Sequence, residues 1–176
     1  LHRKPVVATR AGGLPDKVIP GATGWLVEPH APSTLGAALN EAVPDALARL
    51  PQSQRPLTVH QAGERHIDAL RARYADAGVT AECVPFIADM AARYAWADIV
   101  VCRGGALTVA ELAAVGLGAI IVPLPGAIAD EQTANARFLL DAGAAIVLAQ
   151  FELTGPDAPL AGILGALTRG DARTMA

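Results

Sequence analysis

The 176-residue sequence has few aromatic residues, few cysteines and little excess charge of either sign. Phe, Trp and Tyr make up only 4% of the chain, whereas 52% of the residues are hydrophobic, so Ala, Val, Leu and Ile must fill the core. The net charge is −3 and no basic block is present, which argues against a nucleic-acid-binding surface. No apolar run approaches the ~20 residues of a membrane-spanning helix. We therefore expect no contact of this chain with a membrane.

The two cysteines, Cys83 and Cys102, are isolated in the sequence and belong to no metal-ligand spacing. We expect two buried, reduced thiols, and the alternative is a disulfide or a metal pair. Reduced cysteines and the absence of a secretory signal pattern are typical of a cytoplasmic protein. The length fits one domain over residues 1–176. Because the chain begins at Leu1 and not at Met, we expect it to be a fragment.

Short β-branched runs alternate with helical patterns along the chain. The predicted strands are residues 5–9, 24–28, 57–61, 81–86, 98–103, 119–124 and 144–149. The predicted helices are residues 35–50, 64–77, 87–97, 108–115, 130–142 and 158–167. Most strand segments are continuously apolar, which indicates parallel strands covered on both faces. The sequence predicts an α/β, three-layer, Rossmann-like and doubly wound domain with a mostly parallel sheet of six to seven strands.

The segment 98–111 combines a buried strand, a glycine turn at Gly104 and Gly105, and the start of a helix. Such a turn exposes backbone N–H groups at the positive end of a helix dipole, which suits a phosphate group. Glu111 follows close enough to bind a sugar hydroxyl. Two interpretations remain open from the spacing alone. One is a nucleotide-sugar pocket, and the other is a plain glycine turn with Thr108 capping the helix.

Other polar residues at the predicted carboxyl edge of the sheet are weaker candidates. Gln132 starts a helix after the strand 119–124, and it either faces a ligand or lies in a solvated first turn. His66 falls inside a helical pattern, which indicates a surface histidine. Tyr94 and Trp96 are predicted to be core residues. The sequence has no Ser-His-Asp order, metal-ligand spacing or general-acid pair, so we expect no catalytic residue and no metal site in this chain.

Five stretches resemble those of a known enzyme family. They are Ala38-Leu39-Asn40-Glu41, Val59-His60-Gln61-Ala62-Gly63-Glu64, Val84-Pro85-Phe86-Ile87-Ala88-Asp89-Met90, Tyr94-Ala95-Trp96-Ala97-Asp98 and the run from Val101 to Glu111. In this order they resemble the C-terminal, donor-binding domain of the MurG glycosyltransferases, from about residue 35 to residue 150. The resemblance implies a two-domain GT-B enzyme of peptidoglycan synthesis at the inner face of the cell membrane. Such an enzyme moves N-acetylglucosamine from UDP to a lipid-linked muramyl-pentapeptide, with inversion and without a metal at the sugar site.

The resemblance implies UDP-N-acetylglucosamine as the ligand and no further cofactor. It places Phe86 and Ile87 beside the uracil and Glu111 at the ribose hydroxyls. Arg103 is implied to line the pocket, and Gln132 to reach the sugar. The family normally has two adjacent glutamines at this last position, whereas this sequence has a glutamate followed by a glutamine, so one of the two expected sugar contacts falls on a different residue type.

The diphosphate is implied to lie against the glycine turn. Gly105, Ala106, Leu107 and Thr108 are the residues that would present this turn to the diphosphate. All of the implied contacts are donor-binding contacts. The resemblance implies that the catalytic base and a glycine-rich loop belong to the family's N-terminal acceptor domain, and we expect this chain to lack that domain.

Residues 1–34 do not fit the same family. The runs 4–15 and 21–29 are similar to a segment of the retaining GT-B enzymes related to glycogen and sucrose synthases. At this place in the chain, a MurG donor domain would have its first strand and a glycine-rich phosphate loop, and we find neither motif in residues 1–34. Residues 24–28 are expected to substitute for that first strand, with residues 5–9 as an additional strand. We therefore interpret the chain as a chimera, engineered or recombined, of two donor domains joined near residues 35–43.

These inferences predict the nucleotide-sugar donor-binding domain of a GT-B glycosyltransferase without its acceptor domain. By family the activity is that of a hexosyltransferase, but we expect weak UDP or UDP-sugar binding and no transfer by this chain alone. The alternative is an engineered or recombined, folded scaffold that binds no ligand.

Overall fold

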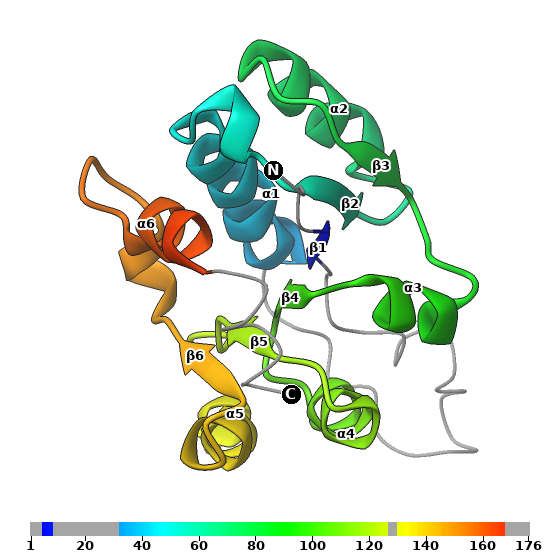
Figure 1. Ribbon diagram of the computed structural model, residues 1–176, viewed down its shortest axis with the longest axis vertical. Coiled ribbons are helices and arrows are strands. Elements are labelled where there is room, and N and C mark those ends of the chain that lie inside the picture. Colours follow the sequence, from blue (N-terminus) through cyan, green and yellow to red (C-terminus); the bar gives the residue numbers. More distant parts are fainter. Residues whose placement is uncertain (1–4, 9–31, 127–129, 168–176) are drawn as a thin grey trace.

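The structure is a computed structural model that describes residues 5–8, 32–126 and 130–167. The strands are β1 (Pro5–Ala8), β2 (Leu57–Gln61), β3 (Glu82–Val84), β4 (Ile99–Cys102), β5 (Ala119–Ile121) and β6 (Ala145–Val147). The helices are α1 (Pro32–Ala48), η1 (Gln52–Gln54), α2 (Ile67–Asp76), α3 (Met90–Trp96), α4 (Ala106–Val115), α5 (Glu131–Asp141), η3 (Gln150–Leu153) and α6 (Pro159–Ala166). Figure 1 shows one sheet between two groups of helices, as the sequence predicts.

All six strands described by the structure are parallel, in the order β3-β2-β1-β4-β5-β6. The strand order reverses between β1 and β4, where the chain crosses from one half of the sheet to the other. In open sheets of this kind, ligands bind beyond the carboxyl ends of the strands at this reversal point. The fold therefore puts the residues that follow β4 at the expected ligand-binding edge.

The position of β1 corrects one prediction. Residues 5–9 were expected to form an additional strand, but β1 is one of the two central strands, with Val7 in register with Val59 of β2 and Val100 of β4. Two β-branched residues suit a strand with neighbours on both sides, and Pro5 comes first in the strand, where it does not interrupt the sheet. Residues 24–28, the expected substitute, lie outside the described residues.

Two hydrophobic clusters fill the spaces on the two faces of the sheet. Ile99 and Val101 of β4 pack toward α1, α2 and α6, whereas Val100 and Cys102 pack toward α3, α4 and α5. This alternation follows from the two-residue period of a strand. In Figure 1, α1 and α6 lie on one side of the strands and α3 and α4 on the other. The three-layer prediction is thereby confirmed.

Helix boundaries differ from the predicted ones by a few residues, for local reasons. α3 begins at Met90 and not at residue 87 because the Asp89 side chain accepts a hydrogen bond from the N–H of Ala92, at 2.9 Å. His66 lies just before α2 and is its N-cap, not an internal helical residue. Gly143 ends α5 with a left-handed backbone, φ 73°, as expected of a helix C-terminus.

The outcome for the predicted core residues is mixed. Tyr94 is buried, as expected, but Trp96 is 37% exposed, and the Arg93 guanidinium lies over its ring. Both cysteines are free thiols. Cys102 is buried, and burial raises the pKa of its thiol to about 12. Cys83 is only half-buried. Among the residues described, no helix is both long and apolar enough to cross a bilayer.

Candidate functional site

The candidate site is the turn between β4 and α4, at the carboxyl edge of the sheet. All four residues of β4 are buried, as are Arg103 and Gly104 after it, so the chain first reaches the surface at Gly105. Gly105 is the N-cap of α4, and the first helical hydrogen bond runs from the N–H of Val109 to the carbonyl of Gly105, at 3.0 Å. The preceding N–H groups have no partner within the helix. Since the helix starts at Ala106, Thr108 does not cap it, which contradicts the plain-turn interpretation in that respect.

The first turn of α4 presents both apolar and polar groups to its surroundings. Leu107 is 65% exposed, and Thr108 is half-buried. Glu111 follows Thr108 by three residues, so the two side chains lie on the same face of the helix. The Glu111 carboxylate accepts a hydrogen bond from the hydroxyl of Tyr94 in α3, with 3.1 Å between Oε2 and the hydroxyl oxygen. The glycine turn, the Thr108 hydroxyl and the Glu111 carboxylate thus follow one another along one face of α4.

The start of α5 lies directly against the glycine turn. A Cβ atom added at Gly104 would overlap the carbonyl oxygen of Gln132 and lie 3.1 Å from its carbonyl carbon. The Asn135 side-chain amide donates a hydrogen bond to the carbonyl of Gly104, at 3.1 Å. The Gln132 side chain accepts one from the N–H of Leu124, at 2.9 Å. The close approach to Gly104 and the bond from Leu124 hold Gln132 beside the turn, and its predicted contact with the sugar stays a prediction.

Arg103 is 4% exposed and points into the fold. Its guanidinium donates hydrogen bonds to the carbonyls of Val122 and Pro123, at 3.1 and 3.4 Å, and to Gln150 Oε1, at 2.8 Å. Burial lowers the pKa of Arg103 to about 10, which leaves the side chain protonated at neutral pH. The cation therefore joins β4, the end of β5 and η3. Its predicted place in a donor pocket stays a prediction.

Phe86 and Ile87 follow β3 and differ in their surroundings. Phe86 is 64% exposed, whereas Ile87 is 6% exposed and packs in the same cluster as Tyr94. The N–H of Ile87 donates to the Gln61 side-chain oxygen at the end of β2, at 3.2 Å. Only Phe86 therefore offers a large free apolar surface at this loop.

A cleft of about 700 Å³ opens beside the turn, at the carboxyl ends of β5 and β6. The residues that line it are Ala38, Glu41, Pro123, Leu124, Pro125, Asp130, Thr133, Val147, Ala149, Gln150, Phe151 and Thr154. It adjoins the turn because Leu124 contacts Gln132 and Gln150 contacts Arg103. Within the described ranges, no group of three or more His, Cys, Asp or Glu residues is placed to hold a metal ion.

Three contacts at this site were not predicted from the sequence. The close approach of Gly104 to Gln132, the hydrogen bond of the Asn135 amide and that of the Tyr94 hydroxyl each join segments that are distant in the chain. The paired glycines were a signal for close backbone approach, although they do not name the neighbour. No pattern in the sequence indicated that the hydroxyl of a core tyrosine meets Glu111.

The fold and the turn define a Rossmann-like domain with its candidate ligand edge at the reversal of strand order. Residues 33–164 match the family Glycosyltransferase family 28 C-terminal domain, and the chain belongs to this family. Its structure is similar to the crystal structure of Acinetobacter baumannii MurG, with a TM-score of 0.78, 35% identity, and coverage of 99% of this chain and 46% of that one. The fold is accordingly that of a MurG-like GT-B domain.

Two relatives have the name UDP-N-acetylglucosamine--N-acetylmuramyl-(pentapeptide) pyrophosphoryl-undecaprenol N-acetylglucosamine transferase. The protein of Aromatoleum aromaticum is 53% identical over 163 residues, which are 92% of this chain and 45% of the relative. The protein of Ralstonia nicotianae is 49% identical over 172 residues, 96% of this chain and 44% of the relative. The chain thus spans less than half the length of these relatives.

Proposed function

We propose that this chain binds UDP-N-acetylglucosamine as the donor half of a peptidoglycan glycosyltransferase. The observation that carries the proposal is the face of α4, in a chain of glycosyltransferase family 28. Its first turn offers backbone N–H groups to the diphosphate, and Glu111 offers a carboxylate to the ribose hydroxyls. Helix N-termini favour anions through their free N–H groups and the helix dipole.

The other predicted contacts complete the proposed pocket. Phe86 and Ile87 flank the uracil, Arg103 lines the pocket from within the fold, and Gln132 reaches the sugar. The exposed ring of Phe86 supports the first of these roles because it leaves a free face for stacking. The position of Gln132 against the glycine turn supports the last.

Titration of the chain with UDP, followed by amide NMR shifts, tests the proposal. We expect saturable shifts at residues 106–111 and 132. Glu111→Gln removes the charge with little change of shape, and we expect it to weaken UDP binding by about 10-fold or more, since hydrogen bonds to charged groups contribute about 1.5–3 kcal/mol.

The matched control for this titration is Asp141→Asn. This substitution removes one negative charge, as Glu111→Gln does, but at the C-terminal end of α5, away from the glycine turn. The Asp141→Asn protein should bind UDP like the unaltered chain. Absence of shifts at millimolar UDP would instead favour the alternative, a folded scaffold without a ligand.

We further propose that sugar transfer needs an N-terminal acceptor domain, which the larger part of each relative outside the matched region would supply. We place the complete enzyme at the cytoplasmic face of the cell membrane. The chain alone is then inactive in sugar transfer. Turnover of UDP-N-acetylglucosamine by the purified chain would contradict this. Adding the acceptor domain in trans should restore transfer.

We also propose that residues 1–34 come from a retaining GT-B glycosyltransferase, so that the chain is a chimera. Its support is that the family match begins at residue 33. The Ralstonia nicotianae relative nevertheless aligns with 96% of the chain, so a direct test is needed. Replacing residues 1–34 by the first strand and loop of that relative should strengthen UDP binding if they are foreign, and should leave it unchanged if they are not.

A further inference from the structure

The Tyr94 hydroxyl is the one polar group of a side chain that is otherwise part of the core. Tyr94 lies in the last turn of α3 and is 5% exposed, and its ring packs in the cluster between the sheet and α4. Its hydroxyl donates to Glu111 Oε2 at 3.1 Å. A buried hydroxyl needs a hydrogen-bond partner, and here the partner is a carboxylate. The contact therefore joins the core to the polar face of α4.

The hydroxyl stays a donor over the whole neutral range. Burial, and then the negative charge of Glu111 together with the hydrogen bond to it, raise the pKa of Tyr94 well above its ordinary value. An uncharged phenol can offer its proton to the carboxylate, whereas a phenolate would repel it. An ionised carboxylate has about four acceptor positions on its two oxygens, so one bond to Tyr94 leaves capacity for a ligand.

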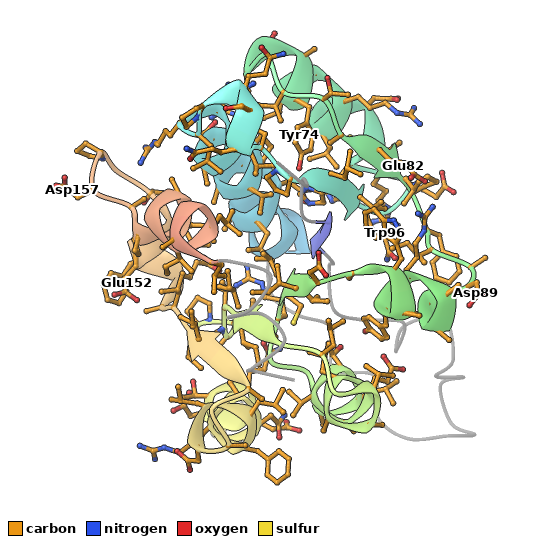
Figure 2. All side chains as sticks on the ribbon, in the orientation of Figure 1. Tyr74, Glu82, Asp89, Trp96, Glu152 and Asp157 are labelled. Carbon is orange, nitrogen blue, oxygen red and sulfur yellow. The ribbon has the colours of Figure 1, made fainter. Side chains whose placement is uncertain are left out.

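α3 is itself anchored, which makes the Tyr94 hydroxyl a fixed point. Asp89 caps the start of the helix, and Arg93 pairs with Glu82 of the edge strand β3 at 2.6 Å. The Arg93 guanidinium also lies 5.9 Å from the centre of the Trp96 ring. Figure 2 shows Glu82 and Trp96 close together at this edge of the molecule and Asp89 at the start of α3.

A glutamate side chain has three rotatable bonds, and holding it in one geometry costs conformational entropy. A fixed donor on one carboxylate oxygen orients the group before a ligand arrives, so less entropy is lost on binding. We propose that Tyr94 is a positioning residue that holds the Glu111 carboxylate in the orientation that accepts the ribose hydroxyls of the donor nucleotide. This inference rests on the proposed function of Glu111.

Tyr94→Phe removes the hydroxyl and keeps the ring in the core. The measurement is the ratio of dissociation constants for 2′-deoxy-UDP and UDP, obtained by amide NMR titration of the chain. We expect UDP binding to weaken by about 3- to 10-fold, because the variant loses the contribution of one oriented hydrogen bond to binding. Binding of 2′-deoxy-UDP should change much less, so the ratio should fall toward one.

Tyr74→Phe is the matched control. Tyr74 is also a buried tyrosine, and its hydroxyl contacts His60 Nδ1 at 3.0 Å, away from Glu111. This variant loses a buried hydroxyl and should keep the ratio of the unaltered chain. Glu111→Asp is a second variant that leaves the core untouched and withdraws the carboxylate from Tyr94, and it should also lower the ratio.

The outcomes separate the two proposals. If the unaltered chain binds no UDP, both the proposed function and the role of Tyr94 are overturned. If it discriminates between the two nucleotides and Tyr94→Phe weakens both equally, or leaves the ratio unchanged, only the role of Tyr94 is overturned. In a Glu111→Gln background, Tyr94→Phe should have no further effect on the ratio, and an equal second drop would also overturn the role.

Discussion

Gly104→Ala is the substitution that most directly probes the geometry of the turn. The added Cβ would overlap the carbonyl oxygen of Gln132 and lie 3.1 Å from the carbonyl carbon and 3.3 Å from the Cβ of the same residue. The first two are backbone atoms, so no side-chain rotation relieves the overlap. The turn before α4 and the start of α5 must therefore move apart.

The expected cost follows from two contributions. Overpacking of a close contact costs about 1–3 kcal/mol. Separation of the two segments also weakens the hydrogen bond from Asn135 to the carbonyl of Gly104, at 3.1 Å, and such bonds contribute about 0.5–1.5 kcal/mol. We expect Gly104→Ala to lower the free energy of unfolding by about 2–4 kcal/mol.

Urea unfolding followed by circular dichroism measures this loss, and Gly162→Ala is its matched control. Gly162 lies inside α6, and a Cβ there would meet nothing within 4 Å. Alanine is favoured over glycine inside a helix, so the control should gain about 0.5–1 kcal/mol. A Gly104→Ala protein within about 0.5 kcal/mol of the unaltered chain would refute the close approach of the turn to α5, since such a difference is typical of an unconstrained surface site.

Two further predictions concern buried polar residues. His60 is 1% exposed between Tyr74 and Asn40, and burial lowers its pKa from 6.5 to about 4. As the pH falls, His60 of the unfolded chain binds a proton before His60 of the folded chain does. The free energy of unfolding is therefore highest above pH 6.5 and should fall by about 3 kcal/mol as the pH drops to about 4. In urea unfolding, the His60→Gln protein should lack this loss and the His66→Gln protein should keep it. Arg103→Met leaves three oxygen acceptors without their donor and should cost about 2–4 kcal/mol in the same assay. An Arg103→Met protein as stable as the unaltered chain would contradict that reasoning.

The local parts of the fold follow from the sequence because their signals are local. The buried strand before Arg103, the glycine turn and the helix after it were predicted from adjacent residues, and the structure confirms all three. The helix start shifts by two residues because Gly105, and not Thr108, occupies the N-cap position. The parallel three-layer arrangement follows equally well, since continuously apolar strands need cover on both faces.

The place of β1 does not follow from such signals. Its four residues identify a strand, but which strands flank it depends on pairing with residues 57–60 and 99–101, far along the chain. The same holds for the site. The sequence correctly predicted that Tyr94 is buried, but only the packing of α3 against α4 brings its hydroxyl to Glu111. The family resemblance suggested a pocket role for Arg103, whereas the fold supplies its guanidinium with three internal acceptors.

α4 is held from both sides, and the two sides should control different parts of the ligand. On one flank, Tyr94 of α3 contacts Glu111 in the second turn of the helix. On the other, Gln132 and Asn135 of α5 contact Gly104 just before the first turn. Disturbing the second flank moves the turn together with the helix behind it, so Gly104→Ala should weaken UDP and 2′-deoxy-UDP alike. Disturbing the first flank changes only the orientation of a carboxylate, so Tyr94→Phe should weaken UDP selectively. Equal selectivity of the two variants would show that α4 does not act as a rigid body between α3 and α5.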